Sequence, residues 1–244
     1  VSGNIQLKFK EHQVHGGFPA RFPARFCPLM KPYLVFDLDG TLVDSVADLA
    51  NAMNAVLSEH HLPTHDIDAY KYFVGNGIKK LVERSIPEDC RTSSFVSELH
   101  SEMVQVYKKR CVDCTKPYSG IEDLLRFLSK KGVRICVLSN KMDELTQRIV
   151  KALFGEYEFS VVRGACPDVP IKPDPQGALL IAEELKIRPQ NILYLGDTNV
   201  DMETANAARM TAVGCTWGFR TEQELIDAGA NFIVRAPSDV KNFF

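Results

Sequence analysis

The stretch FDLDGTLVDS, residues 36–45, decides the fold, because it closes an apolar run with three aspartates, Asp37, Asp39 and Asp44. The run before it, YLVF at residues 33–36, shows no alternation of polar and apolar residues. That pattern is typical of a parallel strand that helices cover on both faces. Ligands of open parallel sheets bind at the carboxyl ends of the strands, so carboxylates at this point predict a site there.

Similar short apolar runs recur along the chain, and amphipathic helical patterns separate them. Strands that alternate with helices predict an α/β fold with a doubly wound parallel sheet. The predicted strands cover residues 33–36, 133–138, 159–162, 191–195, 211–215 and 232–234. The predicted helices of this part cover residues 121–130, 144–153, 175–185 and 200–209.

Residues 45–114 break this alternation, since they hold several helical patterns and no credible strand. We therefore expect an inserted α-helical cap domain there, between core segments 30–44 and 115–244. Ser45 has the spacing of an N-cap residue with an acid, Asp48, in the first helical turn. Asp44, directly before them, is expected to serve as a hinge or capping residue rather than in catalysis.

Residues 1–29 differ from the rest, with a tandem FPARFPARF, several basic residues and a single acidic one. They have neither a helical nor a strand period. Because Met30 stands directly before the first predicted strand, we expect it to be the functional start and residues 1–29 to be a leader or extension without regular structure. A targeting peptide is the alternative, disfavoured because serine is sparse.

The bulk composition excludes several classes of protein. Apolar residues at 45% and charged residues at 25% are typical of a globular protein, and a net charge of −2 gives no electrostatic case for nucleic acid. No run approaches the ~20 apolar residues of a membrane span, and no secretory signal is recognisable. We expect a cytoplasmic protein with a small-molecule partner, as a monomer or a homodimer.

The seven cysteines are odd in number and scattered, which favours reduced thiols over a disulfide framework. Cys111 and Cys114 have the spacing of a zinc knuckle or a redox pair. No second pair accompanies them, so we expect incidental thiols.

Polar residues follow several of the predicted strands, where the sheet would bring them to one edge. Two like charges about 4 Å apart repel by roughly 4 kcal/mol at an effective dielectric near 20, so a carboxylate cluster there requires a cation. Oxygen ligands with room for water favour Mg²⁺, which commonly shares its coordination with a phosphate. The polar residues are Asp37, Asp39, Ser139, Asn140, Lys141, Lys172, Asp197 and Asp201.

Four segments in this order, DLDGTLVDS, LSNK, KPDP and GDTNVD, resemble the motifs of the haloacid dehalogenase superfamily of aspartyl-nucleophile phosphatases. The resemblance covers nearly all of residues 31–240. Two further stretches, FVGNGIKKLVERSI and TWGFRTEQEL, are similar to phosphoglycolate phosphatases and their pyrophosphatase relatives. The resemblance implies a Rossmann-like core, a cap and phosphomonoester hydrolysis with Mg²⁺.

The resemblance also implies catalytic roles. Asp37 would be the nucleophile that forms an aspartyl-phosphate, and Asp39 would protonate the leaving alkoxide and later deprotonate the attacking water. Lys172 and Ser139 would bind the phosphoryl oxygens, with Asn140 beside them in the substrate site.

The implied Mg²⁺ ligands are the carboxylates of Asp37 and Asp197 and the backbone carbonyl of Asp39. Asp201 would lie just outside these ligands or orient Lys172.

In the implied cap, backbone N–H groups near Gly75, Asn76 and Gly77 would face an anionic part of the substrate, and a plain interhelical turn is the alternative for this segment. Thr41 is placed with the substrate-binding residues, and it argues against a mutase, since mutase relatives commonly carry valine there. Gly40 would allow the tight turn after the two acids.

Three functions stay open, and the first is a Mg²⁺-dependent phosphatase of a small phosphorylated acid, foremost 2-phosphoglycolate. A pyrophosphatase or a β-phosphoglucomutase-like phosphomutase would use the same site, and a non-catalytic phosphate-binding protein would have kept only the fold. Lys141, beside the second motif, is expected to face solvent. Arg209 replaces the glycine of relatives after the fourth motif, so a positive φ there would cost ~1 kcal/mol.

Overall fold

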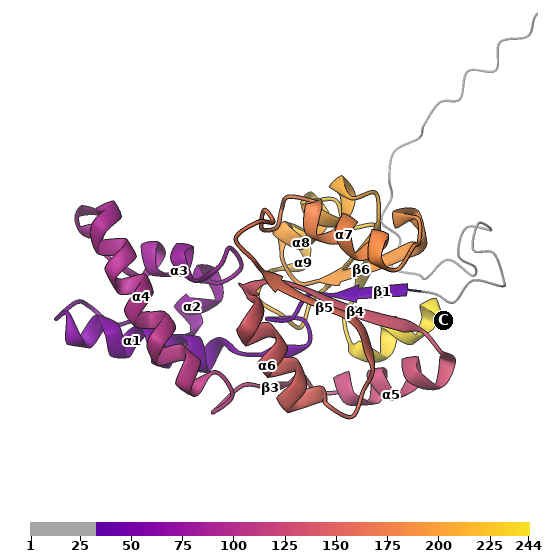
Figure 1. The fold of residues 1–244 in the computed structure, drawn as a ribbon, viewed down its shortest axis with the longest axis horizontal. Coiled ribbons are helices and arrows are strands. Elements are labelled where there is room, and N and C mark those ends of the chain that lie inside the picture. The colour runs from indigo at the N-terminus through magenta and orange to yellow at the C-terminus, as the bar shows by residue number, and fades with distance from the viewer. Residues whose placement is uncertain (1–32) are drawn as a thin grey trace, which may run out of the picture.

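A six-stranded sheet of parallel strands forms the centre of the protein, in the order β5-β4-β1-β6-β7-β8 (Figure 1). The computed structural model describes residues 33–244, so the predictions for residues 1–29 and for Met30 lie outside it. The arrangement confirms the predicted α/β fold class. The strands are β1 Tyr33–Phe36, β4 Arg134–Met142, β5 Phe159–Ala165, β6 Ile192–Gly196, β7 Thr211–Cys215 and β8 Phe232–Val234.

Helices cover both faces of this sheet, as the unbroken apolar strands require. In β1, Leu34 and Phe36 pack with α5 and α6 on one face, whereas Val35 packs with α7 and α8 on the other. Figure 1 shows these two layers below and above the sheet. The helices are α5 Ile121–Lys131, α6 Asp143–Phe154, α7 Gln176–Glu184, α8 Asn199–Ala207 and α9 Glu222–Asp227, with short 3₁₀ turns η2 Pro189–Asn191 and η3 Pro237–Phe243.

The inserted segment is helical and lies beside the carboxyl ends of the strands (Figure 1). It joins the core through a pair of short antiparallel strands, β2 Val43–Asp44 and β3 Lys116–Pro117. Asp44 lies in this connection, and Ser45 rather than Asp44 is the N-cap residue of the first cap helix. The cap elements are α1 Val46–Glu59, α2 Ile67–Phe73, α3 Ile78–Ser85, η1 Glu88–Cys90 and α4 Ser93–Arg110.

The first turn of α1 differs from the prediction. Ser45 holds the N-cap position, but its hydroxyl makes no cap hydrogen bond and instead donates to Oδ1 of Asp39. Asp48 is only 2% exposed, and its carboxylate accepts from the backbone N–H groups of Cys114 and Thr115. A buried carboxylate needs such partners, so Asp48 ties the returning chain to α1.

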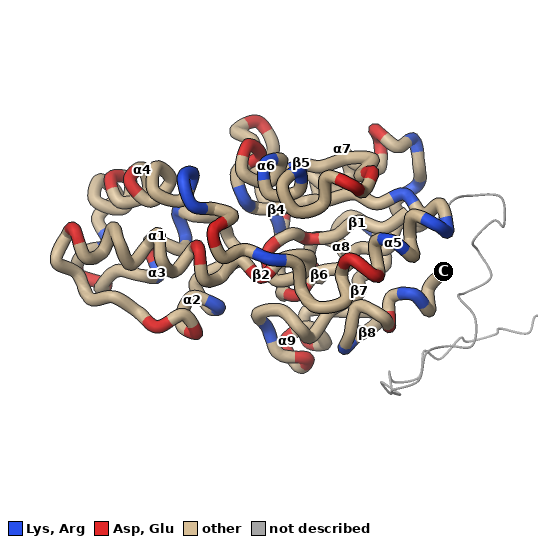
Figure 2. The backbone as a smooth tube through the Cα atoms, turned by 90° about the horizontal axis from the view of Figure 1, so that it is seen from below, with Lys and Arg blue, Asp and Glu red and all other residues tan. Residues whose placement is uncertain are grey.

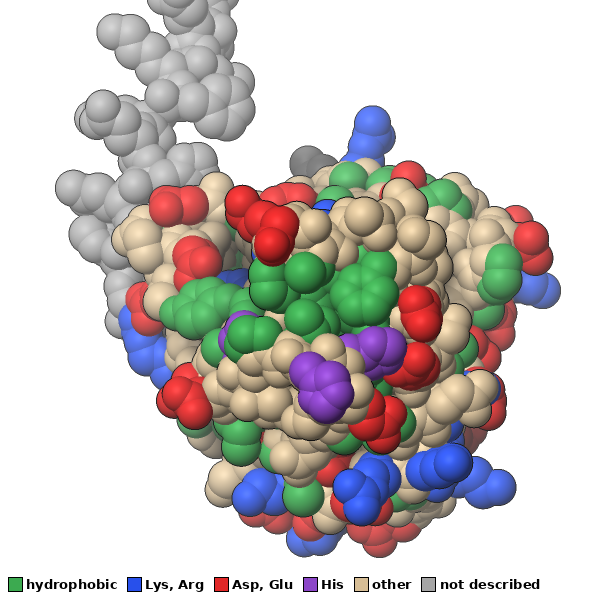
Figure 3. Space-filling model, turned by 90° about the vertical axis from the view of Figure 1, so that its left-hand side faces the viewer, with side chains coloured by type: hydrophobic (Ala, Val, Ile, Leu, Met, Phe, Trp, Pro, Cys, Tyr) green, Lys and Arg blue, Asp and Glu red, His purple; other side chains and the backbone are tan. Residues whose placement is uncertain are grey.

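Basic and acidic residues are interspersed along the backbone of both the core and the cap (Figure 2). The end of the cap that points away from the sheet bears a group of apolar side chains beside histidines (Figure 3). That group is remote from the strand ends. In residues 33–244, no helix combines the length and apolarity that crossing a membrane would take.

Arg209 has φ 58°, so the condition under which an arginine costs stability at this position is met. It follows the C-cap of α8 in a Schellman arrangement, since its N–H bonds to Asn206 and that of Met210 bonds to Ala205. We expect Arg209→Gly to raise the free energy of unfolding by ~1 kcal/mol, because glycine adopts this conformation without a Cβ penalty. Urea unfolding checks this. Ala207→Gly, inside the helix, should have the opposite sign, and destabilisation by both variants would contradict the expectation.

Candidate active site

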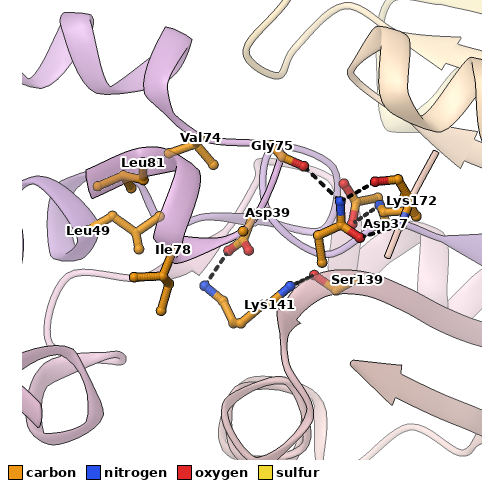
Figure 4. A pocket seen from close by; sticks show the side chains of 12 residues that line it. Asp37, Asp39, Leu49, Val74, Gly75, Ile78, Leu81, Ser139, Lys141 and Lys172 are labelled. Carbon is orange, nitrogen blue, oxygen red and sulfur yellow. Dashed lines mark hydrogen bonds and ion pairs between the residues drawn. The ribbon is translucent and has the colours of Figure 1, made fainter. Parts of the chain in front are cut away.

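The polar residues predicted at the strand ends meet at one place, because β4, β1 and β6 are neighbours at the centre of the sheet. Asp37 directly follows β1, Asp197 directly follows β6, and Ser139 lies within β4. Lys172, in the segment after β5, places Nζ 2.8 Å from Oδ1 of Asp37. Figure 4 shows Asp37, Lys172 and Ser139 lining one side of a pocket between core and cap.

Three buried carboxylates form the centre of this cluster. Asp37, Asp197 and Asp201 are 7%, 0% and 0% exposed, and one oxygen of each lies within 4.8 Å of the others. Burial and repulsion by Asp201 raise the pKa of Asp197 to about 7. Burial, followed by repulsion from Asp201, raises the pKa of Asp37 well above its usual range. The cluster therefore favours a bound cation.

Lys172 supplies only part of the positive charge that would neutralise the three carboxylates. Its Nζ lies 2.7 Å from Oδ1 of Asp201 as well as against Asp37. Burial alone would lower the pKa of Lys172, but these two carboxylates raise it well above its usual range. The other oxygen of Asp201 accepts from the N–H and the hydroxyl of Thr198. Asp201 is thus oriented to hold Lys172, and the one ammonium pairs with two of the three carboxylates.

Asp197 is held by two hydrogen bonds. The hydroxyl of Thr41 donates to Oδ1 at 2.9 Å, and the N–H of Phe219 donates to Oδ2 at 2.8 Å. Gly40 passes close beside it with φ 84°, as its predicted turn requires. A Cβ on Gly40 would lie 2.2 Å from Oδ2 of Asp197. Only glycine fits between the two motifs.

We expect Gly40→Ala to abolish most activity and to lower the unfolding temperature. The left-handed conformation costs ~1–2 kcal/mol for alanine, and the methyl group must also displace the Asp197 carboxylate. Thermal unfolding and phosphate release measure the two effects. Gly132→Ala, at φ 66° in the C-cap of α5, is the matched control, which should lose stability but keep activity. Equal activity losses would contradict a role in placing Asp197.

Lys141 corrects the prediction that it faces solvent, since it is only 5% exposed. Its Nζ lies 2.9 Å from Oδ1 of Asp39 and 2.8 Å from the hydroxyl of Tyr107 in the cap. Burial would lower the pKa of Lys141, but the carboxylate of Asp39 outweighs it and raises the pKa above its usual range. The carboxylate pairing explains why the ammonium can be buried.

Asn140 connects the cap to the core. Its Nδ2 donates to the carbonyls of Gly75, at 3.1 Å, and Lys172, at 2.9 Å. Its Oδ1 accepts from the N–H of Lys172 at 2.8 Å. Asn140 also lines the pocket, but its amide is engaged by these backbone groups.

Of four further residues predicted to bind substrate, two line the pocket and two do not. Gly75 and Gly77 line the pocket, with φ 120° and 80°. Among the described residues that line it, neither Asn76 nor Thr41 occurs. Asn76 accepts instead from Nη2 of Arg84 at 2.8 Å, and the hydroxyl of Thr41 is committed to Asp197. The structure therefore does not support substrate contact by these two side chains.

The cap side of the pocket is apolar, which the sequence did not reveal. Leu49, Val74, Ile78 and Leu81 face the polar core residues across it (Figure 4). These four residues also belong to the hydrophobic core of the cap. The one available signal was the position of Ile78 and Leu81 directly behind the glycine segment.

Comparisons with known proteins agree with this geometry. The family description "Haloacid dehalogenase-like hydrolase" matches residues 34–215. The chain is 31% identical to a phosphoglycolate phosphatase of Aquifex aeolicus, over 85% of this chain and 93% of the relative. It is 33% identical to one of Psychrobacter arcticus, over 80% and 87%.

A solved structure supports the same assignment. The crystal structure of a predicted phosphoglycolate phosphatase from Haemophilus somnus superposes with a TM-score of 0.80 and 25% identity, covering 87% of this chain and 97% of the other. The chain therefore belongs to the haloacid dehalogenase-like hydrolases, which confirms the family predicted from the four sequence motifs.

Proposed function

We propose that this phosphatase hydrolyses a small phosphomonoester through an aspartyl-phosphate on Asp37, with 2-phosphoglycolate as its substrate. The observation that carries the mechanism is the setting of Asp37. Its Oδ1 accepts from Lys172 and from the N–H of Leu38, and within the described residues no hydrogen bond goes to Oδ2. That oxygen is available to attack phosphorus. The names of the Aquifex and Psychrobacter relatives support the choice of substrate.

The cluster fits a divalent cation such as Mg²⁺. The fit rests on buried carboxylate oxygens close together, on raised carboxyl pKa values and on the presence of a single lysine among them within residues 33–244. Asp37 and Asp197 would hold the ion, together with the backbone carbonyl of Asp39, and Asp201 would keep Lys172 in place. When bound, the ion would neutralise charge on the phosphoryl group.

The chain's own residues account for both chemical steps. Oδ2 of Asp37 forms a bond to phosphorus as the ester bond breaks, and Asp39 gives its proton to the leaving alkoxide. Asp39 then takes a proton from a water that attacks phosphorus, which releases inorganic phosphate and frees Asp37. Lys172 and Ser139 contact the phosphoryl oxygens throughout.

The pocket suits a small leaving group. Its empty volume is about 450 Å³ when the open solvent at its mouth is included, so the enclosed space is smaller than that. The carboxylate of phosphoglycolate would meet the backbone N–H groups of Gly77 and Ile78, because α3 begins there without a side-chain cap. The apolar cap residues would exclude water from the phosphoryl group.

A phosphate-release assay over a panel of substrates, with and without Mg²⁺, tests this function. We expect the highest kcat/KM for 2-phosphoglycolate and no turnover without a divalent cation. Preference for pyrophosphate would favour the pyrophosphatase alternative, and isomerisation of a sugar phosphate the mutase. Tight phosphate binding without turnover of any ester would contradict the proposal that the protein is an enzyme, and it would favour the phosphate-binding alternative. Activity in the cytoplasm, and as monomer or homodimer, remains part of the proposal.

We expect Mg²⁺ to raise the unfolding temperature more at pH 8 than at pH 5. The folded pKa values of Asp37 and Asp197 are raised above the usual unfolded value near 4. In the metal-free protein, the contribution of these two carboxyl groups to stability is therefore fully present below that unfolded pKa. The contribution of Asp197 is lost as the pH rises through about 7. Mg²⁺ binds the deprotonated form and reverses this loss. Thermal scans at both pH values measure it, and an equal shift at both would contradict it.

A further inference from the structure

Tyr107 lies in the cap, yet its hydroxyl meets a buried charge of the core. Tyr107 belongs to α4, and the hydroxyl accepts a 2.8 Å hydrogen bond from Nζ of Lys141 in β4. The two residues are 0% and 5% exposed. Nζ also lies 4.8 Å from the centroid of the tyrosine ring, within the range of cation–π attraction. The contact therefore fixes the end of a side chain with four rotatable bonds.

The same ammonium orients Asp39. Lys141 Nζ lies 2.9 Å from Oδ1 of Asp39, and the hydroxyl of Ser45 donates to that same oxygen. Within the described part of the chain, no hydrogen bond goes to Oδ2 of Asp39. Both donors thus hold one oxygen and leave the other for the pocket, which Asp39 lines.

The position of Tyr107 is itself fixed against the core. Lys108, the next residue of α4, pairs with Glu144 of α6 at 2.5 Å. Nη1 of Arg148, also in α6, donates to the backbone carbonyl of Lys108 at 2.6 Å. These contacts hold this turn of α4 on the core.

We infer that Tyr107 is a positioning residue, which reaches from the cap to hold Lys141 where it orients the Asp39 carboxylate toward the leaving group. The inference rests on the proposed function, in which Asp39 protonates the leaving alkoxide. Tyr107 acts through Lys141, since among the described residues it is absent from the pocket lining. The cap thereby completes the proton-transfer group as well as covering the substrate.

The variant Tyr107→Phe tests this through the choice of leaving group. An alkoxide must be protonated as it leaves, whereas p-nitrophenolate leaves readily without a proton. kcat/KM reports the steps up to departure of the leaving group. We expect kcat/KM for an alkyl phosphate to fall about 10- to 100-fold, and that for p-nitrophenyl phosphate by less than about 3-fold.

Tyr70→Phe is the matched control. Tyr70 is also a fully buried cap tyrosine, but its hydroxyl donates to Oδ1 of Asn54 at 2.7 Å, inside the cap. It should leave the ratio of the two kcat/KM values unchanged. A Tyr107→Phe variant that lowers both substrates equally would show a merely structural role and overturn the inference.

A second variant covers the case in which Tyr107→Phe folds poorly. Lys141→Met should shift the same ratio in the same direction, and adding Tyr107→Phe to it should change the ratio no further. Independent effects of the two substitutions would overturn the inference.

A crystal structure of Tyr107→Phe separates this inference from the proposed function. We expect Lys141 Nζ to leave Oδ1 of Asp39, and an unchanged distance would overturn the inference. Failure of the wild-type protein to hydrolyse either ester would refute the proposed function, while the structure would still decide whether Tyr107 positions Lys141.

Discussion

Replacing Asp37 by asparagine is expected to lower kcat by at least about 10⁴-fold while the protein remains folded. The amide cannot form the bond to phosphorus that the carboxylate forms, and no step of the proposed reaction bypasses that bond. Stability should change little, because Asp37 is buried against two other carboxylates and its raised pKa already marks the charged form as unfavourable. Steady-state phosphate release and thermal unfolding measure the two quantities.

The matched control for this variant is Asp123→Asn, in which the same change is made at a side chain that is 71% exposed. It should leave both activity and unfolding temperature unaltered. Turnover by Asp37→Asn within tenfold of the wild-type rate would contradict a nucleophilic role for Asp37. A much lower unfolding temperature of Asp37→Asn than of the wild type would instead indicate that Asp37 has a structural role.

Lys172→Met is expected to have the second largest effect, on both activity and stability. Removing this ammonium takes a donor from the phosphoryl oxygens, which costs about 10²–10³-fold in kcat by comparison with other anion-stabilising groups. It also leaves Asp37 and Asp201 without their shared partner, and breaking a buried ion pair on one side costs ~3–5 kcal/mol.

Mg²⁺ gives this prediction a distinctive signature. Because the ion and Lys172 neutralise the same carboxylates, saturating Mg²⁺ should restore stability more in Lys172→Met than in the wild type, without restoring kcat. Lys130→Met, at an exposed lysine of α5, is the control and should change neither quantity. An equal stabilisation by Mg²⁺ in Lys172→Met and in the wild type would contradict the shared electrostatic role. Differential scanning calorimetry with and without the ion measures it.

Local patterns predicted the core of the protein well, because its strands are covered on both faces. The run TAVGC was predicted as a strand at residues 211–215 and forms β7 with those bounds. The carboxylates at the ends of β1 and β6 were predicted to meet, and Asp37 and Asp197 do so. Parallel topology makes the strand ends neighbours, so order along the chain was enough.

Contacts between the cap and the core could not be predicted in this way, since they follow no period. Lys141 was expected in solvent because a lone lysine usually is, and only the fold brings Tyr107 and Asp39 to it. Asn140 likewise reaches Gly75, which lies 65 positions away in the chain. Such partners are fixed by how two domains pack, which the sequence of either segment does not encode alone.

Short-range rules also failed where a buried partner competed with them. Ser45 has the spacing of a helix cap, in which its hydroxyl oxygen would accept from a backbone N–H. The side chain instead points to Asp39 and donates to it, because a hydrogen bond to a charged carboxylate is stronger than a neutral one. At Arg209 the sequence left the backbone conformation open, and the structure shows a positive φ of 58°. The end of α8 fixes that conformation, because helix ends of this type have one geometry.

The most direct test of the account is a crystal structure of the protein with Mg²⁺ and beryllium trifluoride, which mimics a phosphoryl group on a carboxylate. We expect beryllium to be bonded to Oδ2 of Asp37, with fluorines contacting Lys172 and Ser139. Beryllium bonded to Asp197 or Asp201, or a fluoride complex lying free of Asp37, would contradict the assignment of Asp37 as the nucleophile.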